Sequence, residues 1–309
     1  MAENDNQKNK SQEDGTDARE APPLPRPVKT PMYQAMHAER YLRQAKIKQI
    51  QEAAGTRLLC YVAGHTAPIT RDDVVGIIEL LHNVRRDSNI DFLLHTGGGD
   101  IDAAEKIVSM LRTIVGKGRL RIIVPDFAKS AGTLIALAAD KVVMSDSSEL
   151  GPIDPQFLKK DGDGNARWHS VLNYLEAYKT QSEKLRQHPT DVPAQIMLSK
   201  IDPITVVQFE AIRRRAQKLA EEHLTHWMFQ HKTANYTKIA QDLMDNERWP
   251  SHGQMISWQD AKQMELEVEY LASESEVWRS YWSLYCLQRL AVKDGQKLFE
   301  ADYASLLME

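Results

Sequence analysis

Two short segments of the chain contain residue types whose order is suited to acyl transfer. The glycine run at 97–99 directly follows the apolar segment 91–96. Ser130 comes shortly after the apolar segment 120–125 and opens a stretch of small residues. Glycines let a backbone turn its N–H groups toward a developing oxyanion, and a serine hydroxyl at the positive end of a helix is a candidate nucleophile.

Each segment alone has an ordinary structural explanation. A glycine run after a strand is often a tight turn, and a serine at a helix start is often an N-cap. Together they are more informative, because consecutive strand-to-helix turns of a parallel sheet lie at one edge, beyond the carboxyl ends of the strands. One turn can then supply an oxyanion hole and the next a nucleophile.

The elements that must position these turns are indicated by apolar segments that alternate with helical patterns between residues 56 and 160. Strand-like runs occupy 57–63, 91–96, 120–125 and 141–145, and helix-like stretches occupy 71–86, 101–115 and 130–139. This alternation predicts an α/β domain whose parallel sheet is covered on both faces.

The second half of the chain is predicted to be helical. The helical patterns cover 166–188, 203–230, 234–245 and 257–266. Beyond residue 271, aromatic and leucine side chains recur every three or four positions, at Trp278, Tyr281, Trp282, Tyr285, Leu287 and Leu290. Such a stripe is typical of a core-facing helix or of a subunit interface.

The composition of the 309-residue chain excludes several classes of function. The net charge of −4 provides no basic field for nucleic acid. The two cysteines, Cys60 and Cys286, form neither a metal-ligand motif nor a disulfide framework, which favours a reducing compartment. No apolar run is long enough for a membrane span, and the first residues lack a secretory pattern, so we expect a cytoplasmic protein. No metal or cofactor is predicted.

Nucleotide binding is the competing explanation for the glycines, and the residues argue against it. The dinucleotide pattern requires a glycine where Asp102 stands. A phosphate-binding loop built on Gly116 and Lys117 would need its first glycine at Leu111.

The segments LHTGGGDIDAAEKIV and VPDFAKSAGTLIALAADKVVMSDSSELGPIDPQ, in this order, resemble the Clp peptidase/crotonase superfamily. Within it they are most similar to the serine dehydrogenase proteinase family, which is related to the signal peptide peptidase A group, and the resemblance covers about 55–270. It implies a ββα-superhelix core, a serine peptidase with Ser130 as nucleophile, and an oxyanion hole from Gly98, Gly99 and Ala131. It also implies a protein or peptide substrate and a homo-oligomer.

The resemblance also suggests the partners of Ser130. Clp peptidases have a histidine shortly after the nucleophile, but this chain has Asp154 there, within GPIDP. The serine dehydrogenase proteinase family has a triad in the order Ser, Asp, His, and the late histidine is matched by His252 in WPSH. We therefore predict His252 as the general base and Asp154 as the acid that orients it. Asp140 would lie about 15 Å down the helix from Ser130. The alternative for Asp154 is a purely structural role in its turn.

A Ser/Lys dyad, as in the signal peptide peptidase A group, is the rival mechanism. Lys179 and Lys184 stand at a comparable distance after Ser130, but their surroundings resemble a solvated helical face. Among the remaining histidines, His95 is expected in the core. The three histidines without a metal-binding pattern are expected on a solvated helix surface; they are His223, His226 and His231.

These features predict a serine endopeptidase built from four regions. They are a disordered tail (1–30), an N-terminal helix (31–55), a Clp/crotonase-like peptidase domain (56–270) and a helical C-terminal extension (271–309). Three other functions are compatible with parts of the sequence. They are an inactive peptide-binding scaffold of the same fold, a crotonase-like acyl-CoA enzyme, against which Ser130 argues, and a non-enzymatic assembly protein.

Overall fold

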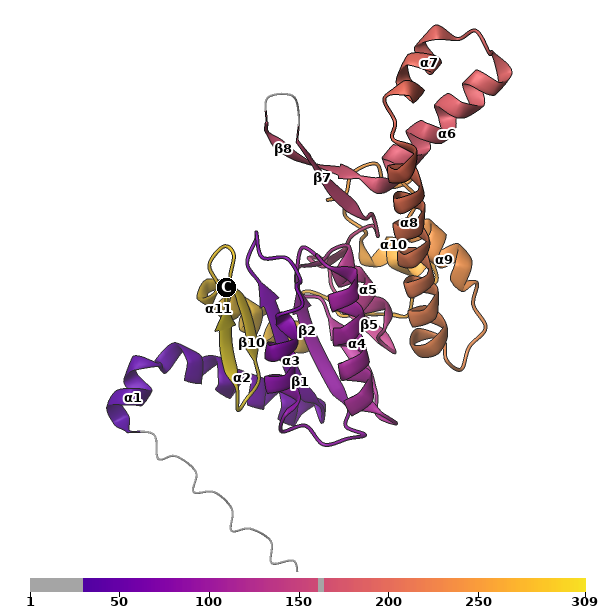
Figure 1. Ribbon diagram of the computed structural model, residues 1–309. Coiled ribbons are helices and arrows are strands. Elements are labelled where there is room, and N and C mark those ends of the chain that lie inside the picture. The colour runs from indigo at the N-terminus through magenta and orange to yellow at the C-terminus, as the bar shows by residue number, and fades with distance from the viewer. Residues whose placement is uncertain (1–29, 161–163) are drawn as a thin grey trace, which may run out of the picture. The chain divides into compact units, whose positions relative to one another are not determined.

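The computed structural model describes residues 30–160 and 164–309, and Figure 1 shows the course of the chain. The chain divides into two units, residues 1–38 and 39–309. The described part of the first unit contains helix α1 (Pro31–Met36), which begins at a proline and is capped by the side chain of Thr30. The predicted tail, apart from residue 30, lies outside the described residues.

The helix predicted over 31–55 is present as two helices. Helix α1 ends at His37, whose backbone leaves the helical region, and α2 (Ala38–Ala54) follows. Helix α1 buries no residue, whereas α2 buries Ile47 and Ile50. The apolar packing that stabilises helices in proteins is therefore confined to the second of the two.

The second unit is organised around a seven-stranded sheet with the order β11-β10-β1-β2-β3-β5-β9. Five of its strands run parallel: β1 (Arg57–Ala63), β2 (Ile90–His95), β3 (Leu120–Ile123), β5 (Lys141–Met144) and β9 (Val268–Tyr270). The first four match the predicted strands, whereas β9 was not predicted. Two antiparallel strands complete the edge beside β1: β10 (Lys297–Glu300) and β11 (Ser305–Met308).

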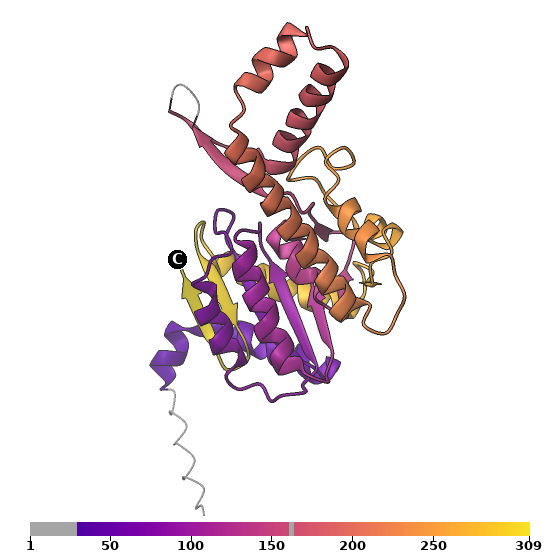
Figure 2. The same ribbon diagram turned by 45° about the vertical axis from the view of Figure 1, so that its right-hand side comes forward.

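Helices cover both faces of the sheet, so its central strands are buried on both sides. Because consecutive residues of a strand point to opposite sides, they belong to different cores. Phe92 and Ile122 belong to a core that also contains the inward sides of α3 (Asp73–Leu81), α4 (Ile101–Val115) and α5 (Ala131–Leu137). Leu93 and Ile123 belong to a second core with α2 and α11 (Glu276–Ala291). Figures 1 and 2 show these helices distributed over the two faces.

The aromatic stripe near the C-terminus belongs to the core. Trp278, Tyr281 and Tyr285 are buried against the sheet, whereas Trp282 and Leu290 on the other side of α11 are exposed. The extension predicted to be helical after residue 271 also contains two strands, β10 and β11, which were not predicted. Each strand is only four residues long, with two apolar residues in β10 and three in β11. Strand β10 pairs with β1, whose sequence lies more than 200 positions earlier, and β11 pairs with β10.

The segment between β6 (Glu149–Leu150) and β9 adds a hairpin and a series of helices. The hairpin consists of β7 (Gln156–Lys160) and β8 (Ala166–Ser170). Figure 1 shows the hairpin projecting beyond the sheet together with the two helices that follow it, α6 (Val171–Gln187) and α7 (Val192–Ser199). The helices are α6 (Val171–Gln187), α7 (Val192–Ser199), α8 (Pro203–His223), the π-helical turn η1 (Leu224–Met228), α9 (Tyr236–Leu243) and α10 (Trp258–Gln263).

The helix predicted over 166–188 begins later than expected. Residues 166–170 form β8, and Ser170 then caps α6 by accepting a hydrogen bond from the N–H of Asn173. Helix α8 returns to the sheet and buries Ala216, Leu219 and Ala220 against the core. Across the described ranges, no helix has the length and apolar character needed to cross a membrane.

Candidate active site

The site is assembled on two short strands beyond the carboxyl ends of the main sheet. Strands β4 (Phe127–Ala128) and β6 (Glu149–Leu150) pair in parallel with each other. The N–H of Thr96, just after β2, donates to the carbonyl of Phe127 at 3.1 Å. On the other side, Leu150 and Ile256 exchange backbone hydrogen bonds of 3.0 and 2.9 Å. This row of backbone contacts joins four segments that are separated in the sequence.

Ser130 precedes helix α5 in a strained backbone conformation. Its φ of 50° and ψ of −112° lie outside the regions that residues with a side chain ordinarily occupy. Such conformations cost on the order of 1–3 kcal/mol and are concentrated at functional sites. The hydroxyl has no hydrogen-bond partner within the described part of the chain, so the turn leaves it available for chemistry.

The glycine turn approaches the serine turn so closely that side chains do not fit between them. Gly98 has φ of 99°, and a Cβ atom there would lie 2.7 Å from the carbonyl oxygen of Lys129 and 2.9 Å from Cβ of Ser130. Gly99 has φ of 149°, and its Cβ would meet the backbone of Ile69 at 2.4 Å. Gly97 has open space instead. Two of the three glycines are therefore required by positive φ and by close approach.

The amide groups of the two turns differ in how they are used. The N–H of Gly98 donates to the Thr96 hydroxyl at 3.1 Å. Within the described ranges, the N–H groups of Gly99 and Ala131 have no hydrogen-bond partner. Free backbone N–H groups beside a nucleophile are the donors that an oxyanion hole requires.

His252 and Asp154 are in contact beside this platform. The Nδ1 atom of His252 lies 3.3 Å from Oδ2 of Asp154, and Oδ1 of the same carboxylate accepts a hydrogen bond of 2.6 Å from Ser170. Asp154 is 8% exposed. A carboxylate that engages Nδ1 holds the imidazole so that Nε2 is the nitrogen left to exchange a proton.

Ser130 and His252 line one cavity of about 1030 Å³. The glycine turn forms part of its wall, and much of the remaining wall is apolar, with contributions from Ile69, Ile101, Ile153, Trp168 and Ile212. No hydrogen bond connects Ser130 with His252 among the described residues. Catalytic hydrogen bonds are often long in unliganded enzymes and shorten when substrate binds.

The lysines of the rival dyad lie elsewhere. Lys179 and Lys184 are exposed on α6, and neither lines the cavity that contains Ser130. Lys179 instead lines a separate hollow beside α8. Lys129 is next to Ser130 in sequence, but its ammonium group forms an ion pair with Glu149 at 2.9 Å. Among the residues that the structure describes, no lysine lines this cavity.

Two other histidines are buried in the fold. His95, 1% exposed, contacts the rings of Phe127 and Tyr285, as expected for a core residue. Burial lowers its pKa to about 3, with repulsion from Arg289 and His65 adding to the effect. The expectation that His223 lies on a solvated surface is wrong. It is buried where α8 crosses α5, with Nδ1 2.8 Å from the carbonyl oxygen of Leu134, and burial lowers its pKa.

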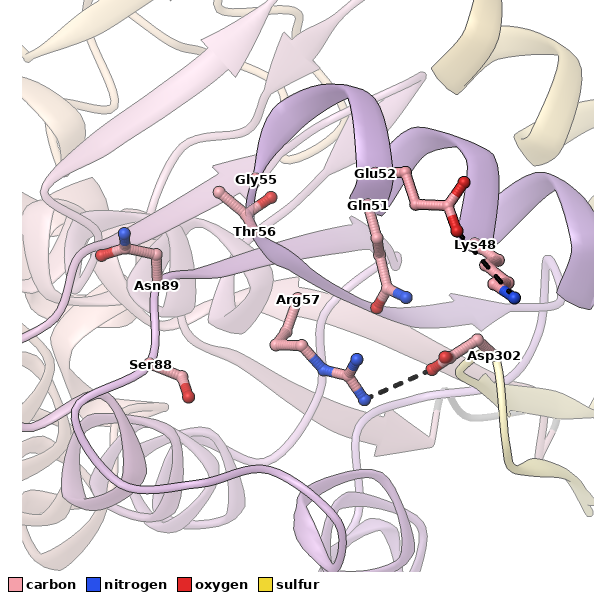
Figure 3. Close-up of a pocket in the computed structure, with 9 residues that line it drawn as sticks. All are labelled: Lys48, Gln51, Glu52, Gly55, Thr56, Arg57, Ser88, Asn89 and Asp302. Carbon is pink, nitrogen blue, oxygen red and sulfur yellow. Dashed lines mark ion pairs between the residues drawn. The ribbon is translucent and has the colours of Figure 1, made fainter.

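A second hollow, of about 360 Å³, lies at the opposite ends of the strands (Figure 3). The view shows Arg57, the first residue of β1, paired with Asp302, and Lys48 paired with Glu52. Its charges are thus matched within the protein, and it lies away from the edge where parallel sheets place their sites. No group of three or more possible metal ligands occurs within the described ranges.

The fold and the site together define a class of protein. A largely parallel sheet positions a glycine turn and a serine turn side by side beyond two neighbouring strands, β2 and β3. This is an α/β protein of the ClpP-like type. The chain belongs to the ClpP-like SDH-type serine proteinases, because the pattern of that family matches residues 65–274.

Individual similar proteins include two uncharacterized proteins of Methanocaldococcus jannaschii. MJ0137 is 43% identical over 201 residues, which cover 65% of this chain and 60% of that protein. MJ1495 is 31% identical over 149 residues, which cover 45% of this chain and 47% of that protein. The matched region thus spans less than two thirds of either relative.

Two solved structures are also similar. A mutant of the membrane-bound stomatin-specific protease 1510-N has 19% identity and a TM-score of 0.38, covering 72% of this chain and 82% of its own. ClpP1 from Listeria monocytogenes has 16% identity and a TM-score of 0.39, covering 72% of this chain and 96% of its own.

Several residues contribute to the site without any signal in the sequence. Ser170 lies within the helix predicted over 166–188, yet its hydroxyl donates a hydrogen bond to Asp154. Trp168 and Ile212 line the cavity from the hairpin and from α8. The Thr96 hydroxyl accepts a hydrogen bond from the glycine turn, and its only sequence signal is its position directly before the glycines.

Proposed function

We propose that this protein is a serine endopeptidase that cleaves peptide bonds through an acyl-enzyme on Ser130. One observation carries the proposal: a histidine paired with a buried aspartate lines the same cavity as a serine in a strained turn. Membership of the ClpP-like serine proteinase family supports a peptide or protein as the substrate.

In the first half of the reaction, Oγ of Ser130 attacks the carbonyl carbon of the scissile peptide bond. Nε2 of His252 accepts the hydroxyl proton, and Asp154 stabilises the imidazolium that results. The C–N bond then breaks, and the imidazolium gives its proton to the leaving amine. The acyl group remains as an ester on Ser130.

In the second half, a water molecule attacks the ester carbonyl while His252 accepts a proton from the water. The bond to Ser130 breaks, the imidazolium returns the proton to Oγ, and the carboxylic acid product leaves. Both tetrahedral intermediates carry a negative oxygen. The N–H groups of Gly99 and Ala131 are the proposed donors to it, with Gly98 contributing if its N–H turns away from Thr96.

The cavity wall supports a substrate with apolar side chains. Ile69, Ile101 and Ile153 lie around the proposed nucleophile, and Trp168 extends the wall along the hairpin. Burial of apolar side chains in such a cleft contributes binding energy that is independent of the reacting bond. We therefore expect cleavage next to apolar residues.

We also retain self-assembly as part of the proposal. The hairpin and the helices that follow it expose large apolar side chains, namely Leu158, Trp168, Val192, Ile196, Met197, Ile204 and Val207. Apolar patches of this kind mark protein–protein contacts. Light scattering of the purified chain tests this directly, and a monomer at all accessible concentrations would contradict it.

The principal test is labelling by a small fluorophosphonate, followed by intact mass, together with hydrolysis of an unfolded protein. The set comprises wild type, Ser130→Ala, His252→Ala and Ser251→Ala. Ser251 is exposed on the same loop as His252 and serves as the matched serine control. We expect Ser130→Ala to abolish both signals, His252→Ala to slow them about 10²- to 10⁴-fold, and Ser251→Ala to behave like wild type.

Two outcomes would contradict the proposal. Wild type that never reacts, in any assembly state, would indicate a scaffold that binds peptides without cleaving them. Labelling that persists in Ser130→Ala would place the nucleophile elsewhere.

A further inference from the structure

The side chain directly before the proposed nucleophile is a buried lysine with an unusually complete set of partners. Lys129 is 8% exposed. Its Nζ atom forms an ion pair with Glu149 at 2.9 Å and lies 3.3–3.5 Å from three backbone carbonyl oxygens, those of Leu150, Gly253 and Gln254. A buried ammonium that is paired and hydrogen-bonded in this way is stable in place, whereas removing it leaves its partners unsatisfied.

These acceptors belong to two different segments. Glu149 and Leu150 form β6, while Gly253 and Gln254 directly follow His252. The backbone N–H of Lys129 also donates to the carbonyl of Thr96, just before the glycine turn. One residue therefore connects the glycine turn, the serine turn and the histidine loop.

The histidine loop, residues 251–255, has few other attachments. Within the described ranges, the hydrogen bonds from other segments to its backbone come from Lys129. A Cβ atom at Gly253 would meet nothing within 4 Å, and Ser251 is exposed. The next backbone tether is at Ile256, which pairs with Leu150.

A second observation shows that the fold makes room for this lysine. The stem of Lys129 runs across Gly151, where a Cβ atom would lie 2.5 Å from Cδ and 3.1 Å from Cα of the lysine. The glycine of the GPIDP segment is thus required by contact with Lys129. The same short segment continues to Asp154, the partner of His252.

We propose that Lys129 is a positioning residue, whose ammonium group fixes the histidine loop relative to Ser130. This inference rests on the proposed role of His252 as general base. Lys129 does not exchange protons with the substrate in this scheme, because its charge is neutralised by Glu149. It acts through His252, by setting where the imidazole lies.

The test compares labelling rates of Ser130 in a double-mutant cycle. Lys129→Met keeps the length of the stem and removes the charge, and Lys141→Met is the control at an exposed lysine that begins β5. We expect Lys129→Met to slow labelling on the order of 10²-fold, since displacement of a catalytic group by about 1 Å has an effect of that size. Lys129→Met combined with His252→Ala should be no slower than His252→Ala alone.

A second measurement does not depend on activity. Hydrogen–deuterium exchange over residues 251–256 should be faster in Lys129→Met than in wild type, and unchanged in Lys141→Met. If the single variant Lys129→Met fails to fold, the double variant Lys129→Met with Glu149→Gln takes its place in both experiments. The second substitution removes the carboxylate that would otherwise be buried without a partner.

The outcomes separate this inference from the proposed function. Wild-type labelling in Lys129→Met, or additive losses in the double variant, would overturn the positioning role while leaving the serine peptidase intact. If wild type itself does not label, the proposed function fails. Hydrogen–deuterium exchange over residues 251–256 then tests by itself whether Lys129 holds the histidine loop. Unchanged exchange in the loop would then overturn the positioning role.

Discussion

His252 and Asp154 lie 98 positions apart in the chain, yet Nδ1 of the imidazole and Oδ2 of the carboxylate are 3.3 Å from each other. The carboxylate is held on its other side by Ser170, which also caps helix α6. The two ends of the hairpin, marked by Asp154 and Ser170, therefore meet beside the proposed catalytic base. Positioning of the imidazole depends on the start of the projecting hairpin as well as on the sheet.

Asp154→Asn tests this relationship. Asparagine preserves the shape of the side chain but lacks the charge that stabilises an imidazolium, so labelling and hydrolysis should fall by roughly 10²- to 10⁴-fold. Asp294→Asn, at an exposed aspartate, is the matched control. Equal rates for Asp154→Asn and wild type would show that Asp154 only shapes its turn.

Gly97 and Gly99 of the turn should respond very differently to substitution by alanine. Gly99→Ala forces a Cβ atom against the backbone of Ile69, and its φ of 149° disfavours a side chain, so we expect a loss of labelling of about 10²-fold or more. Gly97→Ala meets open space and should retain nearly full activity. Kinetics and thermal unfolding of the two variants provide the comparison, and equal behaviour would argue against the oxyanion role of this turn.

Strain at Ser130 can be measured without any substrate. Ser130→Gly and Ser130→Ala both remove the hydroxyl, but only glycine tolerates φ of 50° with ψ of −112°. Ser130→Gly should therefore be more stable than Ser130→Ala by about 1 kcal/mol in urea unfolding. An equal or lower stability for the glycine variant would mean that the turn stores no strain.

The rival dyad predicts a role for a lysine on α6. Lys179 is exposed and lies outside the cavity of Ser130, so Lys179→Met should label at the wild-type rate. The same holds for Lys184→Met. A loss of 10²-fold or more in either variant would favour a lysine base.

Buried His95 should make the fold sensitive to acid. Its pKa falls from 6.5 to about 3 on folding, because burial disfavours the charged imidazolium and repulsion from Arg289 and His65 adds to the effect. Between these values the unfolded chain binds a proton that the folded chain does not, so stability decreases as pH falls from 6.5 toward 3, by roughly 1.4 kcal/mol per pH unit. Urea unfolding at several pH values measures this.

The control is His95→Gln, which cannot gain a proton. Its unfolding free energy should be lower than that of wild type at neutral pH because packing is disturbed. The difference in unfolding free energy between the two proteins should become smaller as the pH is lowered. A constant difference would show that His95 titrates normally in the fold.

The turns that carry Ser130 and the glycines were predictable from the sequence, because each is encoded locally. An apolar strand, a turn of small residues and a helix follow one another within about a dozen positions, and neighbouring parallel strands bring their turns to one edge. The aromatic stripe around Tyr281 likewise indicated a buried face, through helical spacing alone. Local pattern and the geometry of parallel sheets sufficed for these features.

The sequence could not by itself place groups that meet only through long-range packing. The contact of His252 with Asp154 was suggested by family resemblance, while the burial of His223, the pairing of β10 with β1 and the tether from Lys129 to the histidine loop gave no sequence signal. In the sequence, Lys129 resembles an ordinary charged residue beside the proposed nucleophile. Only the tertiary structure, by enclosing its ammonium group among a carboxylate and three carbonyls, decides what it does, because the cost of burying a charge depends on partners that the local sequence does not contain.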